Sequence, residues 1–213
     1  MTSHSTYKGS IPYWIRWGSL LWLLVWFPVY WHTWGLANFL RLCNVAVILT
    51  CAGLLLDNRL LISSQAVSSL MVDTAWVLDV SCRMFAGRHL IGGTEYFFDV
   101  RFPLWIRLLS LYHLILPAVL LWALHRRGYD RRGLMFQSTI ALLVFVLSRL
   151  IDTKENLNFA FSDPFFHHTW GPAPVHVAVS LLFLIVVAYI PTHALLKQLF
   201  PSPSRDLKRH ARD

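Results

Sequence analysis

Six long apolar runs, separated by short polar stretches, dominate the pattern of the chain. Each run has about 20 residues, enough for a helix to cross a hydrocarbon core of roughly 30 Å. The runs lack the period-2 alternation of a β-barrel, and in lipid only a helix or a closed barrel satisfies its own backbone hydrogen bonds. The pattern therefore predicts an all-α membrane protein, a bundle of about six transmembrane helices near 14–34, 37–56, 60–82, 103–125, 133–152 and 173–198.

Apolar residues are too abundant for a soluble domain of this size. The chain has 213 residues, of which 56% are hydrophobic, and a soluble fold of that length has no interior large enough to bury them. We find no repeat and no separate soluble unit. The expected organisation is a single transmembrane domain over 1–200, followed by a basic cytoplasmic tail over 201–213.

The positive charges cluster between the apolar runs rather than along one face. The net charge is +8, and cations concentrate in the loop HRRGYDRRG, in the C-terminal tail and at the N-terminus. Six spans place these three regions on one side, which the positive-inside rule makes cytoplasmic. We therefore expect both termini in the cytoplasm, an integral protein of a bacterial inner membrane, membrane lipids as partners and no nucleic acid. Three arginines on the opposite side count against this orientation: Arg83, Arg88 and Arg101.

In this topology the polar residues inside the spans gather in the outer half of the bundle. A charged side chain in the bilayer costs at least roughly 2.5–3.5 kcal/mol and usually faces a cavity or the bundle interior. We infer one polar cavity that opens outward. The residues expected to bind a substrate there are Asp79, Arg107, Ser110, Arg149, Asn156 and Asn158. The alternative is that these groups only join helices, with Asp79 pairing with Arg149 or Arg107.

Cys43 and His113 are the two residues of this region that are able to perform covalent chemistry. A thiol becomes a strong nucleophile when a neighbouring base or cation favours its thiolate. The two residues lie at similar depth and meet if the second and fourth spans are neighbours. The residues alone leave a second interpretation open, in which Cys43 fills space and His113 is a hydrogen-bonded packing residue.

Three segments of the chain resemble known membrane families. The string NFLRLCNVAVIL (38–49) is similar to the Leu-x-Leu-Cys stretch of YwaF-type bacterial membrane proteins and their animal relative, an ether-phospholipid acyltransferase. It also resembles the androgen-induced and androgen-dependent TFPI-regulating proteins, ester hydrolases with a threonine nucleophile in a similar segment. The stretch RLLSLYHLILPAVLLW (107–122) resembles the region that supplies the catalytic histidine in both families. ENLNFAF and the following residues, up to 191, resemble the Asn-rich loop, Gly-Pro-x-Pro and closing helix of the YwaF type.

The resemblance implies a lipid hydrolase or acyltransferase with Cys43 as the nucleophile and His113 as the general base. It also implies that Asn156 and Asn158 donate hydrogen bonds to a head group or an oxyanion. Asn44 departs from the acidic residue expected after the cysteine. The alternative is a non-enzymatic protein, either a small-solute carrier or a structural subunit with a membrane-protein partner.

Histidines also raise the question of metals and haem. His167 and His168 are adjacent and have no accompanying carboxylate pattern, so they do not form a typical zinc motif. A haem held between His113 and His176 is geometrically conceivable. We expect neither a metal nor another cofactor.

Overall fold

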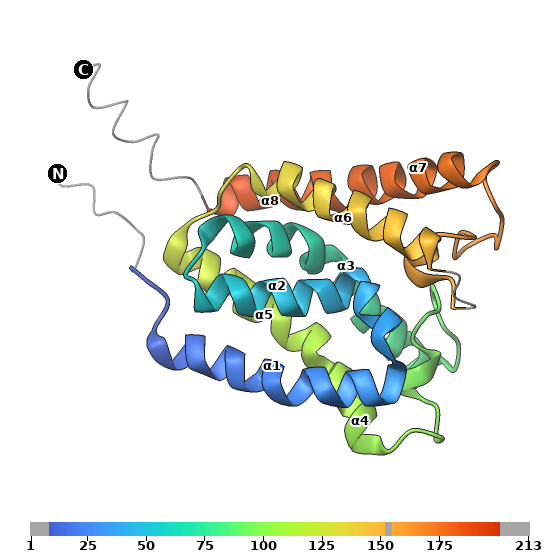
Figure 1. Ribbon diagram of the computed structural model, residues 1–213, viewed down its shortest axis with the longest axis horizontal. Coiled ribbons are helices and arrows are strands. Elements are labelled where there is room, and N and C mark those ends of the chain that lie inside the picture. The colour runs from blue at the N-terminus through green and yellow to red at the C-terminus, as the bar shows by residue number, and fades with distance from the viewer. Residues whose placement is uncertain (1–8, 152–154, 201–213) are drawn as a thin grey trace.

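All regular structure in the described part of the chain is helical. The computed structural model describes residues 9–151 and 155–200, so the predicted tail over 201–213 lies outside the described residues. The helices are α1 (Tyr13–Trp34), α2 (Leu42–Leu55), α3 (Arg59–Ala86), α4 (Leu104–Leu108), α5 (Tyr112–Arg127), α6 (Gly133–Leu150), α7 (Ala173–Leu184) and α8 (Ile190–Leu199) (Figure 1). Short helical turns lie between them: η1 (Leu36–Leu40), η2 (Glu95–Phe97), η3 (Leu109–Leu111), η4 (Leu157–Phe159) and the π-helical η5 (Ile185–Tyr189).

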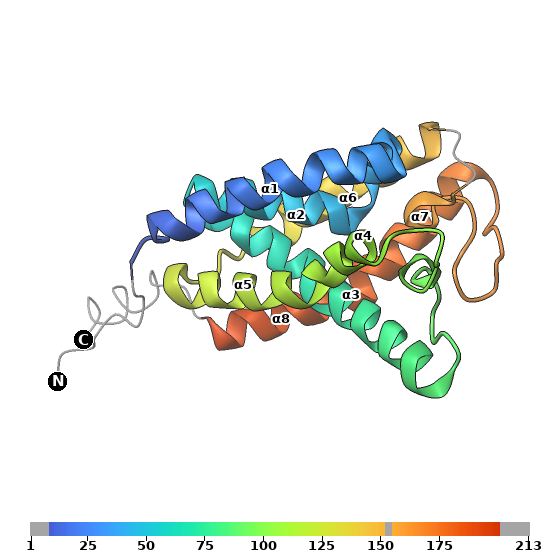
Figure 2. The ribbon, with the colours of Figure 1, turned by 90° about the horizontal axis from the view of Figure 1, so that it is seen from below.

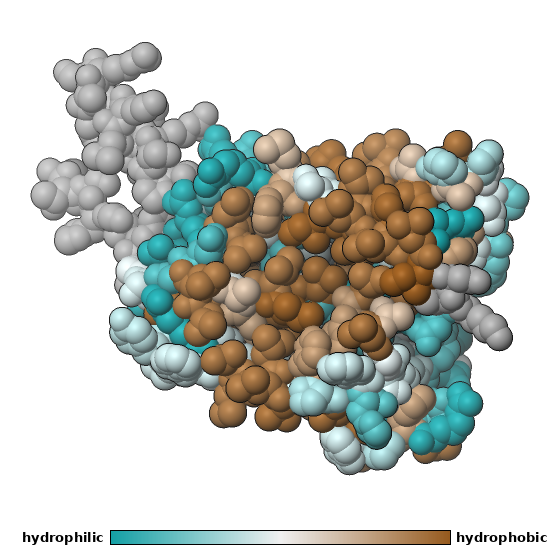
Figure 3. Space-filling view, in the orientation of Figure 1, coloured by the Kyte–Doolittle hydropathy of each residue, from teal (hydrophilic) through white to brown (hydrophobic). Residues whose placement is uncertain are grey.

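Helical segments occupy all six predicted positions. η3 joins α4 to α5, and η5 joins α7 to α8, so that each pair forms one long segment. Four segments are long and apolar enough to cross a membrane: Arg59–Ala86, Leu104–Arg127, Gly133–Leu150 and Ala173–Leu199. The chain is therefore an integral membrane protein. The surface in Figure 3 agrees, because an apolar belt covers the middle of the bundle and hydrophilic side chains gather at its two ends.

The second predicted span differs from a continuous helix. Arg41 has extended backbone angles (φ −63°, ψ 130°), which separate η1 from α2. α2 has only 14 residues and rises about 21 Å, less than a hydrocarbon core of about 30 Å. The prediction of one unbroken helix over 37–56 is wrong at Arg41. The break places Cys43 in the first turn of α2 instead of one to two turns inside a helix.

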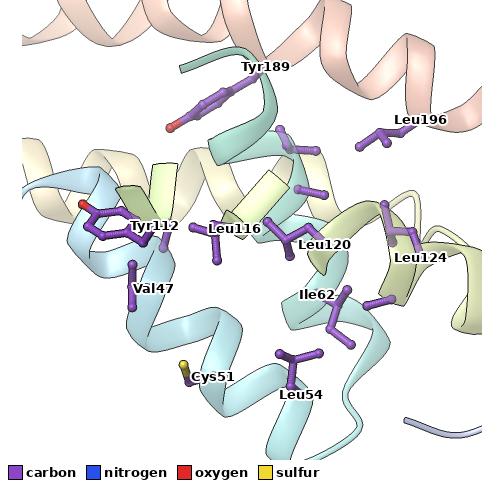
Figure 4. Close-up of a cluster of buried hydrophobic side chains, with 14 of the residues drawn as sticks. Val47, Cys51, Leu54, Ile62, Tyr112, Leu116, Leu120, Leu124, Tyr189 and Leu196 are labelled. Atoms are coloured by element: carbon purple, nitrogen blue, oxygen red, sulfur yellow. The ribbon is translucent and has the colours of Figure 1, made fainter. Parts of the chain in front are cut away.

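α3 is the central helix of the bundle. It packs against α2, α5, α6 and the segment formed by η5 and α8. Apolar side chains from these helices form the core, including Val47 and Leu54 of α2, Ile62 of α3 and Leu120 of α5 (Figure 4). Because α3 touches so many partners, residues along its length are held in fixed positions relative to α2 and α5.

A polar network crosses the core toward the end of the bundle that carries the termini. Gln137 of α6 donates to Ser68 of α3 (3.0 Å) and to the Tyr189 hydroxyl (3.2 Å), and accepts from Gln65 (3.2 Å). The sequence pattern predicted only apolar packing in the half of the bundle toward the described chain ends. This prediction is wrong at the network around Gln137. Buried amides and hydroxyls are stable in such a place only when they bond to one another.

Basic residues converge at the end of the bundle where both described chain ends lie (Figure 1). Asp57 pairs with Arg16 (2.9 Å) and Arg127 (3.1 Å). Asp130 pairs with Arg132 (2.8 Å), whose hydrogen bonds hold the pKa of the Asp130 carboxyl below its usual value. The opposite end is formed by the connections around η1, η2 and η4.

The start of α6 depends on a glycine. A Cβ atom on Gly133 would lie 3.0 Å from the carbonyl carbon of Ser63 and 3.1 Å from the Ser64 nitrogen, both in the backbone of α3. We expect Gly133→Val to lower the free energy of unfolding by about 1–3 kcal/mol, because helices must separate to admit the side chain. Thermal unfolding in detergent measures this change. Gly18→Val is the control, since a Cβ there meets nothing within 4 Å; equal effects of the two variants would contradict the close packing.

Candidate functional site

A cavity of about 750 Å³ lies at the end of the bundle opposite the described chain ends. Its walls come from η1, α2, α3, α5 and α7, and from the connections that contain η2 and η4. Apolar and aromatic side chains form most of the lining, and Cys43 and His113 lie in it together. Its volume falls in the range of about 300–1,000 Å³ that is usual for small-molecule sites.

Cys43, His113 and Asp73 come from three different helices, and the first two line this cavity. The Cys43 thiol of α2 lies 4.0 Å from Asn44 Oδ1. His113 Nδ1 lies 2.7 Å from Asp73 Oδ1. Because Asp73 occupies Nδ1, Nε2 is the ring nitrogen left for the thiol. A nucleophile, a base and a carboxylate that orients the base make up the arrangement of a catalytic triad.

The start of α2 favours negative charge at Cys43. The first N–H groups of a helix have no intrahelical acceptor, and they carry the positive end of the helix dipole. Asn158 Oδ1 accepts the N–H of Leu42 at 2.9 Å. Among the described hydrogen bonds, none uses the N–H of Cys43. This N–H is therefore a donor that a bound carbonyl oxygen is able to use.

Aromatic side chains hold the imidazole of His113 in place. The Trp76 ring stacks on it, with ring centroids 4.5 Å apart and planes at 18°. The Trp76 indole N–H donates to the Tyr96 hydroxyl at 3.0 Å. Tyr112, the neighbour of His113 in α5, donates to Asn44 Oδ1 at 2.8 Å. Asn44, the residue after Cys43, thus holds Tyr112 in place.

Asn156 and Asn158 line the cavity, but their amides make hydrogen bonds within the protein. Asn158 Nδ2 donates to the Leu40 carbonyl (2.7 Å) and to Ser148 Oγ (2.9 Å), so this residue fixes the junction of η1 and α2. Asn156 Nδ2 donates to the Ser162 carbonyl at 2.8 Å, and its Oδ1 accepts from the Phe161 N–H. Both residues have positive φ (46° and 54°), which asparagine tolerates better than most residues. Their observed role is to shape the connection between α6 and α7.

Two further carboxylates organise the loops that cover the cavity. Asp79, near the end of α3, accepts hydrogen bonds from the N–H groups of Ile91 (2.6 Å) and Gly92 (3.1 Å) and from the Thr94 hydroxyl. Asp163 accepts from the N–H groups of Phe166 and His168. Although burial raises the pKa of Asp163, these backbone hydrogen bonds lower it below the usual carboxyl value.

The arginines and Ser110 do not face the cavity as the sequence suggested. Arg107 donates to the Phe97 carbonyl at 3.1 Å, and Arg149 donates to the Ala160 carbonyl at 3.2 Å. Ser110 bonds to the Tyr30 hydroxyl at 2.9 Å. Asp79 does line the cavity, but it pairs with His89 (2.9 Å) rather than with either arginine. The expected ion pair between Asp79 and Arg107 or Arg149 is therefore not formed.

Asp73 is the functional residue that sequence reasoning did not select. It is a carboxylate near the middle of the most polar span, and its cost in lipid is a signal that it has a specific partner. The partner was not identifiable from the spacing, because His113 is 40 residues away on another helix.

The histidines considered for metal or haem binding have other contacts. His176 Nδ1 accepts from the Trp170 N–H (3.1 Å), and its Nε2 lies 3.0 Å from the Phe159 carbonyl, so both ring nitrogens are occupied. His113 Nδ1 is bound to Asp73 at 2.7 Å, and both ring nitrogens of His176 are occupied, so this pair is not arranged to hold a haem. Within residues 9–151 and 155–200, no three His, Cys, Asp or Glu side chains are grouped to hold a metal ion.

Comparison with protein-family models, with curated proteins and with solved structures gives no match to this chain.

The thiol of Cys43 should react faster with alkylating reagents than an isolated thiol, because His113 takes its proton. We expect His113→Ala to slow alkylation by a membrane-permeant iodoacetamide by about tenfold or more, the change in thiolate fraction for one pKa unit. Asp73→Asn should slow it less, since the base remains but is no longer oriented. Mass spectrometry of Cys43 measures the rate, and Cys82 in the same molecule is the control. Unchanged rates in His113→Ala would show that the two side chains do not act together.

Proposed function

We propose that the protein is an intramembrane lipid hydrolase or acyltransferase that works through an acyl-enzyme on Cys43. The observation that carries this proposal is that Cys43 and His113 line one large, mostly apolar cavity, and that Asp73 holds the imidazole of His113 at 2.7 Å. The resemblance of 38–49 to the YwaF type implies Cys43 as the nucleophile, and the resemblance of 107–122 to both families implies His113 as the base.

The first half-reaction transfers an acyl group to the protein. His113 takes the thiol proton, and the Cys43 sulfur attacks the carbonyl carbon of a lipid ester. The negative charge that develops on the carbonyl oxygen faces the first turn of α2, where the N–H of Cys43 is able to stabilise it. His113 then gives the proton to the departing alcohol as the carbon–oxygen bond breaks, and a thioester on Cys43 remains.

The second half-reaction regenerates the thiol. Water, in a hydrolase, or a second lipid alcohol, in an acyltransferase, attacks the thioester carbonyl while His113 takes its proton. The sulfur leaves and is reprotonated by His113. Asp73 keeps the ring oriented and stabilises its positive charge in both half-reactions, so it acts as a positioning residue.

The arrangement of charge supports six spans with both termini in the cytoplasm, within a bacterial inner membrane. The loop between α5 and α6 and the start of α1 place Arg16, Arg127 and Arg132 at one end, which the positive-inside rule assigns to the cytoplasm. The cavity then faces the outer side. The alternative of a small-solute carrier has less support, because the apolar core and the Gln137 network fill the bundle below the cavity.

Covalent trapping tests the chemistry. Purified protein incubated with a fluorescent long-chain acyl thioester should become labelled on Cys43, and Cys43→Ala should remove the label. Cys82→Ala is the matched control and should label like the wild type, because Cys82 lies outside the cavity lining. Labelling of Cys43→Ala at the wild-type level would refute the acyl-enzyme.

Accessibility labelling tests the topology in a variant that lacks all three cysteines. Val100→Cys and Arg131→Cys introduce thiols at exposed positions on the two ends of the bundle. In intact cells a membrane-impermeant maleimide should label Val100→Cys and should not label Arg131→Cys until the cells are opened. The reverse pattern would invert the orientation, and labelling of both would be incompatible with either.

A further inference from the structure

One wall of the cavity is built from side chains that face outward from a membrane-crossing segment. Val179 and Phe183 of α7 line the cavity, yet they are 41% and 54% exposed. Val72 and Ala75 of α3 also line it. Both helices belong to segments that are apolar enough to cross a membrane. An opening between them therefore faces lipid chains rather than water.

The packing of α3 explains why an opening exists there. α3 contacts η5 and α8, which lie toward the other end of the bundle. Toward the cavity, α3 and α7 move apart (Figure 2). The π-helical η5, which contacts α3, lies between α7 and α8, and π-helical turns of this kind are frequent at functional sites.

We propose that this opening is a lateral entrance through which one acyl chain of a membrane lipid ester reaches Cys43. The inference rests on the proposed function and names the substrate: a membrane glycerolipid whose head group carries no net negative charge. The α3–α7 side of the cavity is apolar and suits a hydrocarbon chain. A chain lying along it has its ester end near Trp76 and His113, which line the same cavity.

The charges in the cavity restrict the head group. Among the described residues, four carboxylates line it, those of Asp79, Glu95, Glu155 and Asp163, against one arginine, Arg41. Arg41 is already paired with Glu155 at 3.2 Å. A lipid with a net negative head group is repelled by this set, whereas a zwitterionic or neutral one is not.

Photocrosslinking in vesicles tests the entrance independently of catalysis. The probe is phosphatidylethanolamine with a diazirine near the carboxyl end of one acyl chain. In Cys43→Ala protein we expect crosslinks to cavity residues of α3 and α7. Val179→Trp should reduce these crosslinks by about tenfold, equivalent to about 1.4 kcal/mol of lost binding. Leu182→Trp is the matched control, because Leu182 is 61% exposed on the same helix but does not line the cavity.

The outcomes separate the entrance from the chemistry. Equal crosslinking in the two tryptophan variants would overturn the entrance, and equal crosslinking by phosphatidylglycerol with the same diazirine chain would overturn the head-group restriction. Acylation of Cys43 in the wild type is read in parallel. Crosslinking at α3 and α7 without that acylation would leave a lipid-binding groove and refute the enzyme, whereas acylation that Val179→Trp does not change would keep the enzyme and refute the entrance.

Discussion

The hydrogen bond between Asp73 and His113 is the constraint on which the rest of the structure depends. A carboxylate buried between membrane-crossing helices is costly unless it is paired and hydrogen-bonded. Here the pairing has a length of 2.7 Å and joins α3 to α5. It requires these two helices to be neighbours at the end of the bundle that holds the cavity, and it leaves Nε2 as the ring nitrogen without this partner. The central position of α3 and the location of the cavity beside it are consistent with this single requirement.

The position of the Cys43 thiol at the cavity depends on a second feature, the break in the backbone before α2. A continuous helix over this span would bury Cys43 among packed turns with every N–H already used. The extended backbone at Arg41 starts a new helix there, and its first N–H groups need acceptors inside the protein. Asn158, from the connection between α6 and α7, supplies one across 116 residues. The loop that closes the cavity thus also fixes the helix that carries the thiol.

The sequence predicted the six helical segments, since apolar length and caps are local properties. It also predicted Cys43 and His113 in one region, since both lie at similar depth, and both line the cavity; their joint role in catalysis stays a prediction. It did not predict the break at Arg41, the role of Asp73 or the network around Gln137. Each of these depends on a partner many residues away, and spacing along one helix carries no information about that partner. Arg107 and Arg149 show the same limit: their depth indicated a polar environment, but backbone carbonyls of nearby loops provide it.

The half of the bundle toward the described chain ends is closed, which limits the directions from which the two reactants of the proposed reaction would reach Cys43. Ile62, Leu120 and Leu124 fill the core there, and Gln65, Ser68, Gln137 and Tyr189 satisfy one another, so the cavity has no continuation toward the end with the chain termini. In the proposed reaction an acyl chain would then enter from the side between α3 and α7. A water molecule or a polar acceptor would enter from the loop-covered end near Arg41 and Glu155. The two reactants of an acyl-enzyme would reach Cys43 from different directions and without displacing one another. In the proposed reaction, the width of the loop-covered end would decide between hydrolysis and acyl transfer, because it would set whether the second reactant is water or a lipid alcohol.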